Sequence, residues 1–349
     1  MNRAPHSCTS SLVFGAVLAH VWGMSGLTPL EACLAQALDG TAPVRTEPLR
    51  LAQAPGHILA EDLVLTHDLP AAHEALRAGF AVRALDLMGA GPTLPIPLTN
   101  PHALLPGQLL PPGTDAILTE DSAPGPGHPA AIHAPAPGEG VRRAGHEGRK
   151  GDTLLRAGQQ LGARQVLLAQ LAGASDLPVR RPRVHLLPGL ALADYLAVWV
   201  QSLGARVTDK NPDLTIRPTP HHQPRLALAP GDTAWLAREG GALVLDLPSR
   251  FDAAFGALLA LGLPVLAALA GATPRPASRP VTRKIASTVG LSELVLLART
   301  EAGWLPGPAG TVTLAALARA EAFALIPPGS EGIAAQTPLS GLHLDNAFG

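Results

Sequence analysis

The chain has 349 residues, 47% of them apolar, and a mean hydropathy of +0.21, so it is long enough for two or more domains with their own cores. Charged residues make up 15% and nearly cancel to a formal net charge of −1, which gives no bulk field that favours nucleic acid or an anionic membrane. The two cysteines, Cys8 and Cys33, are too few for a disulfide framework and lack metal-ligand spacing. This cysteine usage is typical of a reducing compartment, so we expect a cytoplasmic protein with no bound metal. From the charge balance we expect no nucleic-acid partner and no membrane partner.

Basic residues are unusually dominated by arginine. Of the 26 basic residues, only Lys150, Lys210 and Lys284 are lysine, and Ala, Leu, Pro and Gly are abundant as well. We attribute this bias to genomic base composition, so the number of arginines is not by itself taken as a sign of function.

Residues 11–24 form an apolar run with some features of a secretory signal peptide. Arg3 is the one positive charge ahead of it, His20 interrupts it, and no A-x-A cleavage pattern follows. The run is too short to cross a bilayer. Export stays the less favoured alternative. We expect residues 1–26 to be a flexible extension, or translation to start at Met24 instead of Met1.

The tetrapeptide T-P-L-E predicts the first helix, with Thr28 as N-cap, Pro29 in the first helical position and Glu31 in the third. Small and apolar residues then recur at helical spacing: Leu30, Cys33, Leu34, Ala37 and Leu38. Asp39–Gly40 ends this helix. With the strands expected around 46–63, we assign residues 27–62 and 147–180 to one domain that is split in the sequence.

Residues 63–146 consist of short apolar stretches separated by Pro and Gly clusters. The stretches FAVRAL, TLPIPL, AILTED and AAIHAPA have the length and composition of strands, whereas SAPGPGHP is typical of a loop. We therefore predict a β-rich insertion domain.

Residues 181–276 alternate between strand and helix patterns. After a helix over 163–171, RVHLLP predicts a buried strand, DYLAVWVQSLGARV a helix ended by Gly204 plus a strand, and DLTIRP a further strand. This order predicts a small parallel sheet. The strand ALVLDLP and the apolar helix 251–271 follow, with Pro264 either kinking or dividing that helix.

Residues 273–280, TPRPASRP, are predicted to be a linker. Residues 277–349 are assigned to a compact β-rich terminal domain with a short helix at LAALARAEA.

Five phrases, in this order and with this spacing, resemble the molybdopterin molybdenumtransferase family, which includes MoeA and the gephyrin E-domain: LTPLEACLAQAL, RTEPLRLAQAPGHILAEDLVLTHDLP followed by GFAVRA, LLPPGTDAILTEDS, PGEGVRRAGHEGRKGDTLLRAGQQLGARQVLLAQLAG, and LPVRRPRV. The resemblance spans residues 27–349. It implies an elongated α/β multidomain chain that works as a homodimer. Its parts would be the split N-terminal domain, the β insertion, a truncated three-layer α/β/α molybdopterin-binding-like domain and a C-terminal β-barrel.

Active members of this family insert molybdate into adenylylated molybdopterin with a divalent metal such as magnesium, and several of their chemical groups are replaced here. The family's aspartate-rich loop falls on residues 73–79, where Ala78 occupies an aspartate position. The family's Thr-Gly-Ala-Pro falls on residues 106–109 and begins with Pro106. Two further substrate loops are replaced, the first by PGLALADY, where Asp194 is a plausible N-cap, and the second by a loop in which Arg217 and Pro218 take the place of glycines.

Two more differences occur downstream. Asp232 stands where the family has a lysine, and LPSRF at 247–251 replaces LPGNP. The family's Gly-Glu-Asp becomes Gly145, His146 and Glu147, so one carboxylate is lost and another is lengthened.

The remaining ligand-binding candidates are Arg142, Arg143, His146, Glu147 and Thr311. The arginines, with Lys150, either bind phosphate or pair with Glu139, Glu147 and Asp152 at the surface. Thr311 matches a serine of the family, but an N-cap role explains a threonine there equally well.

No residue is assigned a catalytic or metal-binding role. His221 and His222 lack a spaced third ligand. Asp115, Glu120 and Asp121 are better explained by a turn, a strand and a second turn.

Three functions remain open. The first is a non-catalytic protein of molybdenum cofactor biosynthesis or handling, which binds molybdopterin or its adenylylated form, or a molybdenum cofactor protein. The second is an active molybdenumtransferase with a rebuilt site, and only this one requires molybdopterin, molybdate and magnesium. The third is a dimeric scaffold that binds no pterin. Loss of several transition-state contacts together favours the first.

Overall fold

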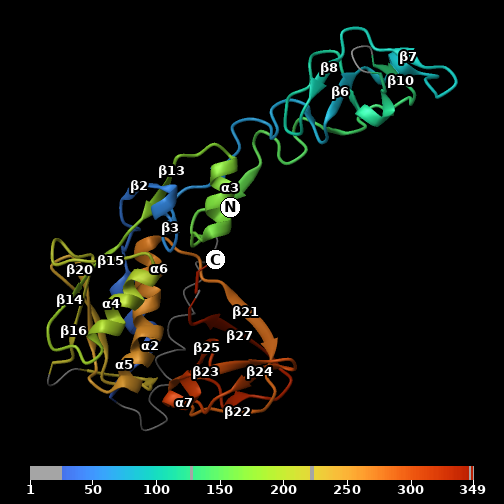
Figure 1. Cartoon of the computed structure of the whole chain (residues 1–349). Helices are drawn as coiled ribbons and strands as arrows, with labels where there is room; N and C mark the ends of the chain where they lie inside the picture. The colour runs from blue at the N-terminus through green and yellow to red at the C-terminus, as the bar shows by residue number, and fades with distance from the viewer. Residues whose placement is uncertain (1–25, 126–128, 221–223, 346, 349) are drawn as a thin grey trace, which may run out of the picture. The chain divides into compact units, whose positions relative to one another are not determined.

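The computed structural model describes residues 26–125, 129–220, 224–345 and 347–348 (Figure 1). Contacts divide the chain into a larger unit, formed by Met1–Glu61, Ala157–Val166 and Ser175–Gly349, and a smaller unit, formed by Asp62–Arg156 and Leu167–Ala174. Each unit is described by itself. The apolar run at 11–24 lies outside the described residues.

A five-stranded sheet, here called the parallel sheet, forms one side of the larger unit. Its order is β15-β14-β16-β20-β19. The strands are β14 (Arg183–Leu186), β15 (Arg206–Val207), β16 (Leu214–Pro218), β19 (Trp235–Glu239) and β20 (Ala242–Leu247). All pairs are parallel except β19 with β20, so the predicted parallel sheet is confirmed.

One face of the parallel sheet carries the apolar side chains. Val184, Leu214 and Leu243 are in register, as are Leu186, Ile216 and Leu245. These rows join a single core with buried residues of α2 (Leu30–Leu38), α4 (Ala193–Ser202), α5 (Phe251–Ala257) and α6 (Leu263–Ala270). All the helices of that core therefore cover the same face.

The opposite face of the parallel sheet is polar. Its alternate residues His185, Thr215 and Arg217 stay partly exposed, and Val244 is buried there without joining the core. This arrangement differs from the predicted three-layer α/β/α domain, which would have helices on both faces of the sheet. Within the described residues the sheet has helices on one face, because the pleat places every core-forming residue of the strands on that face.

The helix of residues 251–270 continues past Pro264. A π-helical segment, Leu258–Gly262, joins α5 to α6, and Pro264 lies in the first turn of α6. Proline has no N–H to donate and its ring crowds the carbonyl four residues earlier, here that of Ala260. The π-helical segment contains Ala260, so the wider turn accommodates proline without a break. Gly271 ends the helix in the left-handed conformation, with φ +61.

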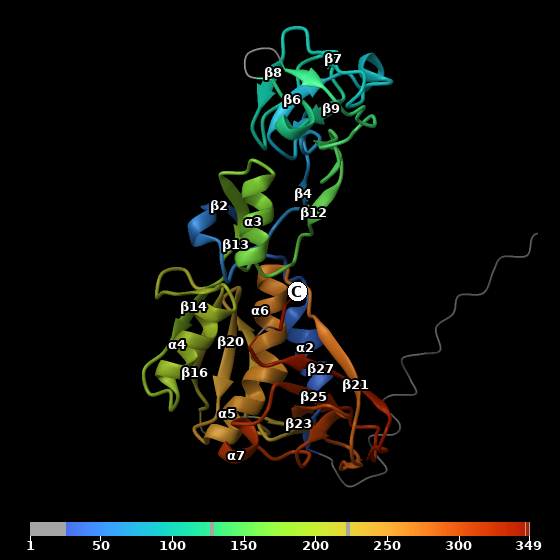
Figure 2. The same cartoon turned by 45° about the vertical axis from the view of Figure 1, so that its right-hand side comes forward.

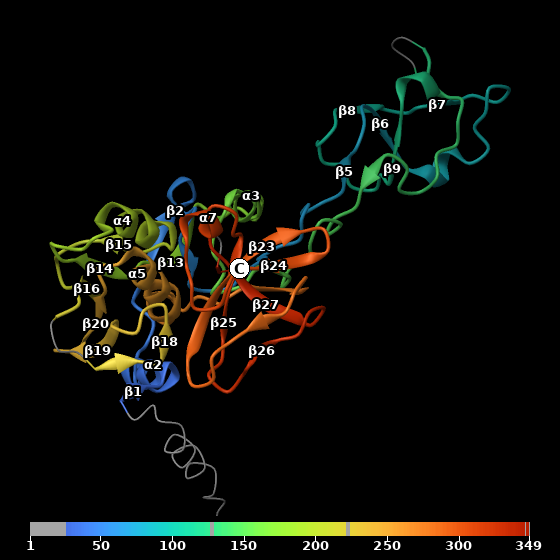
Figure 3. The same cartoon turned by 90° about the horizontal axis from the view of Figure 1, so that it is seen from below.

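This long helix is buried between two sheets. Its core includes Leu214 and Leu245 of the parallel sheet and also Leu294, Leu296 and Phe323 of the C-terminal strands. Figures 2 and 3 show the helix between β20 on one side and β25 and β27 on the other. The helix is long and apolar enough to cross a membrane, but 83% of its most apolar window is buried inside the protein, as in the core helix of a soluble fold.

The C-terminal strands form a second sheet, here called the terminal sheet, with the order β18-β23-β25-β27-β21 and β24 paired to β23. Its strands are β18 (Leu228–Ala229), β21 (Pro276–Pro280), β23 (Ser292–Thr300), β24 (Gly303–Pro306), β25 (Ala322–Ile326) and β27 (Pro338–His343). A bridge between Val281 and Trp304 links the end of β21 back to β24, so these strands close a ring around the buried Trp304. A separate pair, β22 (Ile285–Ala286) with β26 (Gly332–Ile333), and the short helix α7 (Leu314–Leu317) complete this part.

The predicted linker at 273–280 is wrong, because β21 pairs with β27 over five residues. Two helix starts also differ from prediction. Thr28 lies in β1 (Leu27–Thr28), which pairs with β17 (Arg225–Leu226), and Pro29 is the N-cap of α2. In α4 the N-cap is Leu192, and Asp194 lies in the first turn.

The other predicted helical features of this region are present. Helix α3 spans Ala163–Leu171 as predicted, and α2 buries Leu30, Cys33 and Ala37. A three-stranded sheet of β2 (Thr46–Arg50), β13 (Asp176–Arg180) and β3 (Ile58–Leu59) completes the larger unit.

The smaller unit is built from short strands. They are β4 (Leu63–Val64), β5 (Glu74–Ala75), β6 (Gly79–Val82), β7 (Ile96–Pro97), β8 (His102–Leu104), β9 (Ala116–Leu118), β10 (Ala130–Ala131), β11 (Val141–Arg142) and β12 (Thr153–Leu155). Gly79 has φ +154, and a Cβ there would lie 2.3 Å from the carbonyl oxygen of Leu118. The β6–β9 pairing therefore requires glycine at this position, whatever the preceding loop contains.

Gly256 allows the long helix to approach the backbone of residue 230. A Cβ at position 256 would lie 2.3 Å from the carbonyl oxygen of Pro230. We expect G256A to lower the free energy of unfolding by about 2 kcal/mol in urea denaturation.

G262A, in the same helix, is the matched control. Its Cβ would meet the ring of Trp199 at 3.1 Å, a side chain that can shift, and alanine's helix propensity offsets the cost. Equal destabilisation by the two variants would contradict the proposed close approach.

Candidate functional site

Four of the candidates found in the sequence lie in the smaller unit. Arg142, in β11, donates a hydrogen bond to Glu147 at 2.7 Å and lies 3.9 Å from Glu74, its cross-strand partner. Arg143 and His146 are exposed and have no ion pair among the described residues. The Arg142–Glu147 pair is 37% and 50% exposed, so it contributes less than about 1 kcal/mol to stability. Arg142 was predicted either to bind phosphate or to pair with a carboxylate at the surface, and the structure contains the surface pair with Glu147.

The other two carboxylates considered as partners have different roles. Glu139 accepts from Arg77 at 2.9 Å, and the N–H of Ala136, followed by His133 and Arg77, lowers the pKa of Glu139. Asp152 accepts from the N–H of Arg149 at 2.8 Å. Among the described residues, neither carboxylate pairs with Arg142 or Arg143, so the predicted surface pairing is wrong for Glu139 and Asp152.

The carboxylate at position 115 is structural, because Asp115 accepts from the N–H of Ala84 at 2.7 Å. Glu120 and Asp121 lie exposed in a short 3₁₀ turn. No group of three or more His, Cys, Asp or Glu residues could hold a metal within the described ranges. His221 and His222 lie outside those ranges.

The threonine at position 311 is exposed, and its hydroxyl lies 3.5 Å from the carbonyl oxygen of Ala309. The N-cap of α7 is instead Thr313, whose hydroxyl accepts from the N–H of Ala316 at 3.2 Å. The N-cap explanation for Thr311 is therefore wrong. Thr313 is the better cap because it directly precedes the first helical residue.

The carboxyl ends of β14, β16 and β20 meet at one edge of the parallel sheet, the edge where α/β sheets bind ligands. A Cβ at Gly189, after β14, would lie 3.5 Å from Pro218 at the end of β16, so these two replaced loops are neighbours. Pro188, Pro218 and Pro248 contribute no N–H donor at this edge.

Arg217 forms the main charged cluster of the polar face near this edge. Its Nε donates to Asp246, whose side chain is 3% exposed, and its two terminal nitrogens donate to Glu239 at 2.8 and 3.0 Å. Hydrogen bonds to Asp246 and Glu239 raise the pKa of Arg217, and the guanidinium lowers the pKa of Glu239. This cluster is internally neutralised, so its guanidinium has little capacity left for an anionic ligand.

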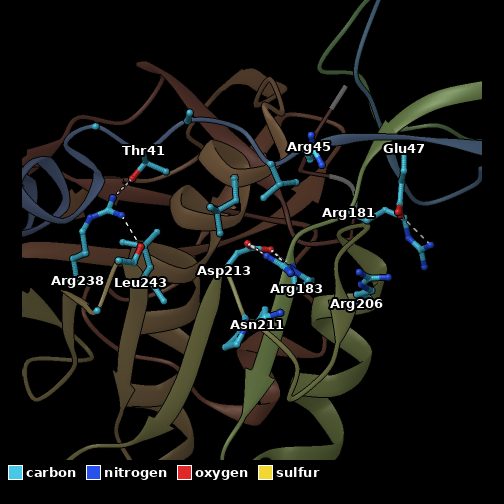
Figure 4. A pocket seen from close by; sticks show the side chains of 18 residues that line it. Thr41, Arg45, Glu47, Arg181, Arg183, Arg206, Asn211, Asp213, Arg238 and Leu243 are labelled. Carbon is cyan, nitrogen blue, oxygen red and sulfur yellow. Dashed lines mark hydrogen bonds and ion pairs between the residues drawn. The ribbon is translucent and has the colours of Figure 1, made fainter.

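The amino ends of the same strands border a cavity of about 890 Å³, here called the arginine pocket (Figure 4). Five arginines line it: Arg45, Arg181, Arg183, Arg206 and Arg238. Two carboxylates, Glu47 and Asp213, face them. In Figure 4, Arg181, Arg183 and Arg206 gather on one side, and Arg238 lies with Thr41 on the other.

Three of these arginines are held by the fold. Arg183 donates to both carboxylate oxygens of Asp213, at 2.7 and 3.0 Å, and this bond raises the pKa of Arg183. Arg181 donates to Glu47 at 3.2 Å. Arg238 donates to the carbonyls of Ala37 and Asp39 at the end of α2, where it complements the helix dipole.

The positive character of the pocket extends to its surroundings. Arg45 and Arg206 are exposed and have no ion pair within the described part of the chain. Burial, and then the charge of Arg181, lower the pKa of His57. The number of arginines alone did not predict this pocket, although three arginines lie close together in the segment Arg180–Arg183.

Substituting Arg217 tests whether its cluster holds a buried charge. We expect R217M to lower the free energy of unfolding in urea by about 3 kcal/mol, because Asp246 is left buried without a counter-ion. R225M is the control, since its pair with Asp232 is exposed, and it should cost less than about 1 kcal/mol. The double variant R217M/D246N should recover part of the loss, and a double variant no more stable than R217M would contradict this role.

Comparison with known proteins agrees with the described fold. Residues 28–173 match the family model of the MoeA N-terminal region, domains I and II. A molybdopterin biosynthesis MoeA protein of Pyrococcus horikoshii OT3 has the same fold, with a TM-score of 0.71 and 20% identity over 90% of this chain and 99% of that chain. A second structure from that organism gives a TM-score of 0.70 at 19% identity, over 90% of this chain and 98% of that one.

A molybdenum cofactor biosynthesis protein of Pyrococcus furiosus gives a TM-score of 0.59 at 17% identity, again over 90% of this chain and 98% of the other. At these identities the likeness establishes the fold. No curated protein sequence matches the chain. The match of residues 28–173 to the MoeA N-terminal region and the fold shared with the MoeA structures confirm the resemblance found in the sequence.

Proposed function

We propose that the protein acts in molybdenum cofactor biosynthesis or handling as a non-catalytic protein that binds molybdopterin, its adenylylated form or a molybdenum cofactor protein. The observation that carries this proposal is a retained fold whose carboxyl-edge loops lack the expected ligand groups. In those loops, PGLALADY follows β14, Arg217 and Pro218 take the place of glycines at the end of β16, and Ser249 takes the place of a glycine after β20. The guanidinium of Arg217 is neutralised by Asp246 and Glu239.

A resident magnesium ion does not fit the residues present. Magnesium is bound through carboxylates and water, and the loop at 73–79 offers a single carboxylate, Glu74, which faces Arg142 at 3.9 Å. Gly79 is retained for the β6–β9 pairing. The loop therefore keeps its structural glycine without the ligands that a metal requires.

Family activity also needs several groups to act together. Removal of one preorganised transition-state contact costs about 10² to 10³ in rate. Replacement at position 78, at position 106 and in the loops after β14 and β16 would reduce turnover far below that of an intact enzyme. We further propose that the protein works in the cytoplasm as a homodimer or as the partner of another molybdenum cofactor protein.

Turnover and binding can be measured on the same sample. Purified protein is mixed with adenylylated molybdopterin, molybdate and magnesium, with the Pyrococcus horikoshii MoeA protein as a parallel sample. We expect pterin fluorescence to report binding while AMP release stays at background. AMP release above background would support a rebuilt active site instead, and absence of both signals would support a scaffold that binds no pterin.

Restoring one carboxylate should not restore turnover. We expect A78D to leave AMP release at background, because the loops near Pro106, Gly189 and Arg217 remain replaced. The thermal midpoint of A78D serves as the folding control. Turnover gained by A78D alone would show that the other loops are dispensable and would overturn the argument from their replacement.

A further inference from the structure

The arginine pocket lies at the amino edge of the parallel sheet, whereas the replaced family loops follow the carboxyl ends of its strands. We propose that this pocket is a second ligand site, which binds a small molecule bearing a phosphate or diphosphate group. The proposal is independent of pterin binding.

The arginine pocket carries more positive than negative side chains. Five guanidinium groups face two carboxylates across the pocket. Asp213 is committed to Arg183, and Glu47 to Arg181. Arg45 and Arg206 have no counter-ion among the described residues, so the pocket retains excess positive charge where an anion would enter.

Two guanidinium groups of the pocket are held in place by the fold before any ligand binds. Asp213 accepts from the backbone N–H of Arg183 at 2.8 Å and from two nitrogens of its guanidinium, which fixes this side chain at the start of β14. The Arg181 side chain is 28% exposed, and its Nε is buried without a hydrogen-bond partner. Fixed guanidinium groups lose little entropy when they bind phosphate oxygens in pairs.

The lining also indicates how the ligand would lie. Arg238 is occupied by the carbonyls at the end of α2, so the anionic group belongs on the side of Arg183 and Arg206 (Figure 4). Val44, Leu243 and Leu269 line the same pocket and suit an uncharged body. A cavity of about 890 Å³ has the size of a small-molecule site, and the chain's net charge of −1 does not favour a polyanion.

Calorimetric titration of the full chain with inorganic pyrophosphate and, separately, with AMP tests the site. We expect pyrophosphate to bind in the submillimolar range, and AMP to bind with at least the same affinity if the apolar side holds the nucleoside. The double variant R45Q/R206Q should lose about tenfold or more in affinity for both probes. Both arginines are exposed and have no ion pair with any residue that the structure describes, so the variant should keep the thermal midpoint of the parent protein.

R250Q is the matched control, because Arg250 is also exposed but lies outside the pocket and pairs with Asp252. It should bind both probes like the parent chain. Failure of both probes to bind at millimolar concentration would overturn the proposal, as would equal affinity in R45Q/R206Q. Tighter binding of an acidic peptide than of either probe would replace it with a protein-docking site. Pterin fluorescence measured on R45Q/R206Q separates these outcomes from failure of the proposed function.

Discussion

Burial of one apolar helix between two sheets is the constraint on which the larger unit depends. The helix of residues 251–270 packs against Leu214 and Leu245 of the parallel sheet and against Leu294 and Leu296 of the terminal sheet, so both of its sides lie within one core. A helix that is apolar all round is stable in water only when such cover is complete. This requirement explains why the helix tolerates a π-helical segment before Pro264, where a break would expose apolar surface on two sides.

The helices pack on one face of the parallel sheet, and this packing determines which side chains the other face carries. Because the helices of the core share the face of Val184 and Leu245, the opposite face stays polar, and Asp246 is buried there beside Arg217. A buried carboxylate requires a counter-ion. Arg217 supplies it next to the edge where a ligand would otherwise need a free cation, so stability and ligand binding compete for the same guanidinium.

Local patterns in the sequence predicted much of the fold, and long-range packing accounts for the rest. The periodicity of α3 and the apolar runs of β14, β16 and β20 were sufficient because each is encoded within a few residues. The strand β21 was missed because its prolines are typical of a linker, yet Pro276 and Pro280 stand at its two ends, where a missing donor matters least. The arginine pocket was missed because the number of arginines was not taken as a sign of function, and because Arg45, Arg206 and Arg238 join the Arg181 and Arg183 segment only in the folded protein.

The pairing of β18 with β23 makes the terminal sheet depend on residues far upstream in the chain. Leu228 and Ala229 extend the terminal sheet beside Ser292 and Glu293, while β17, a few residues earlier, pairs with β1. Three distant parts of the chain therefore share hydrogen bonds across one short segment. The terminal sheet is a folding partner of the rest and not an appended module: cleavage before residue 277 would leave β23 with an open edge and the long helix with one bare side, two surfaces that promote aggregation.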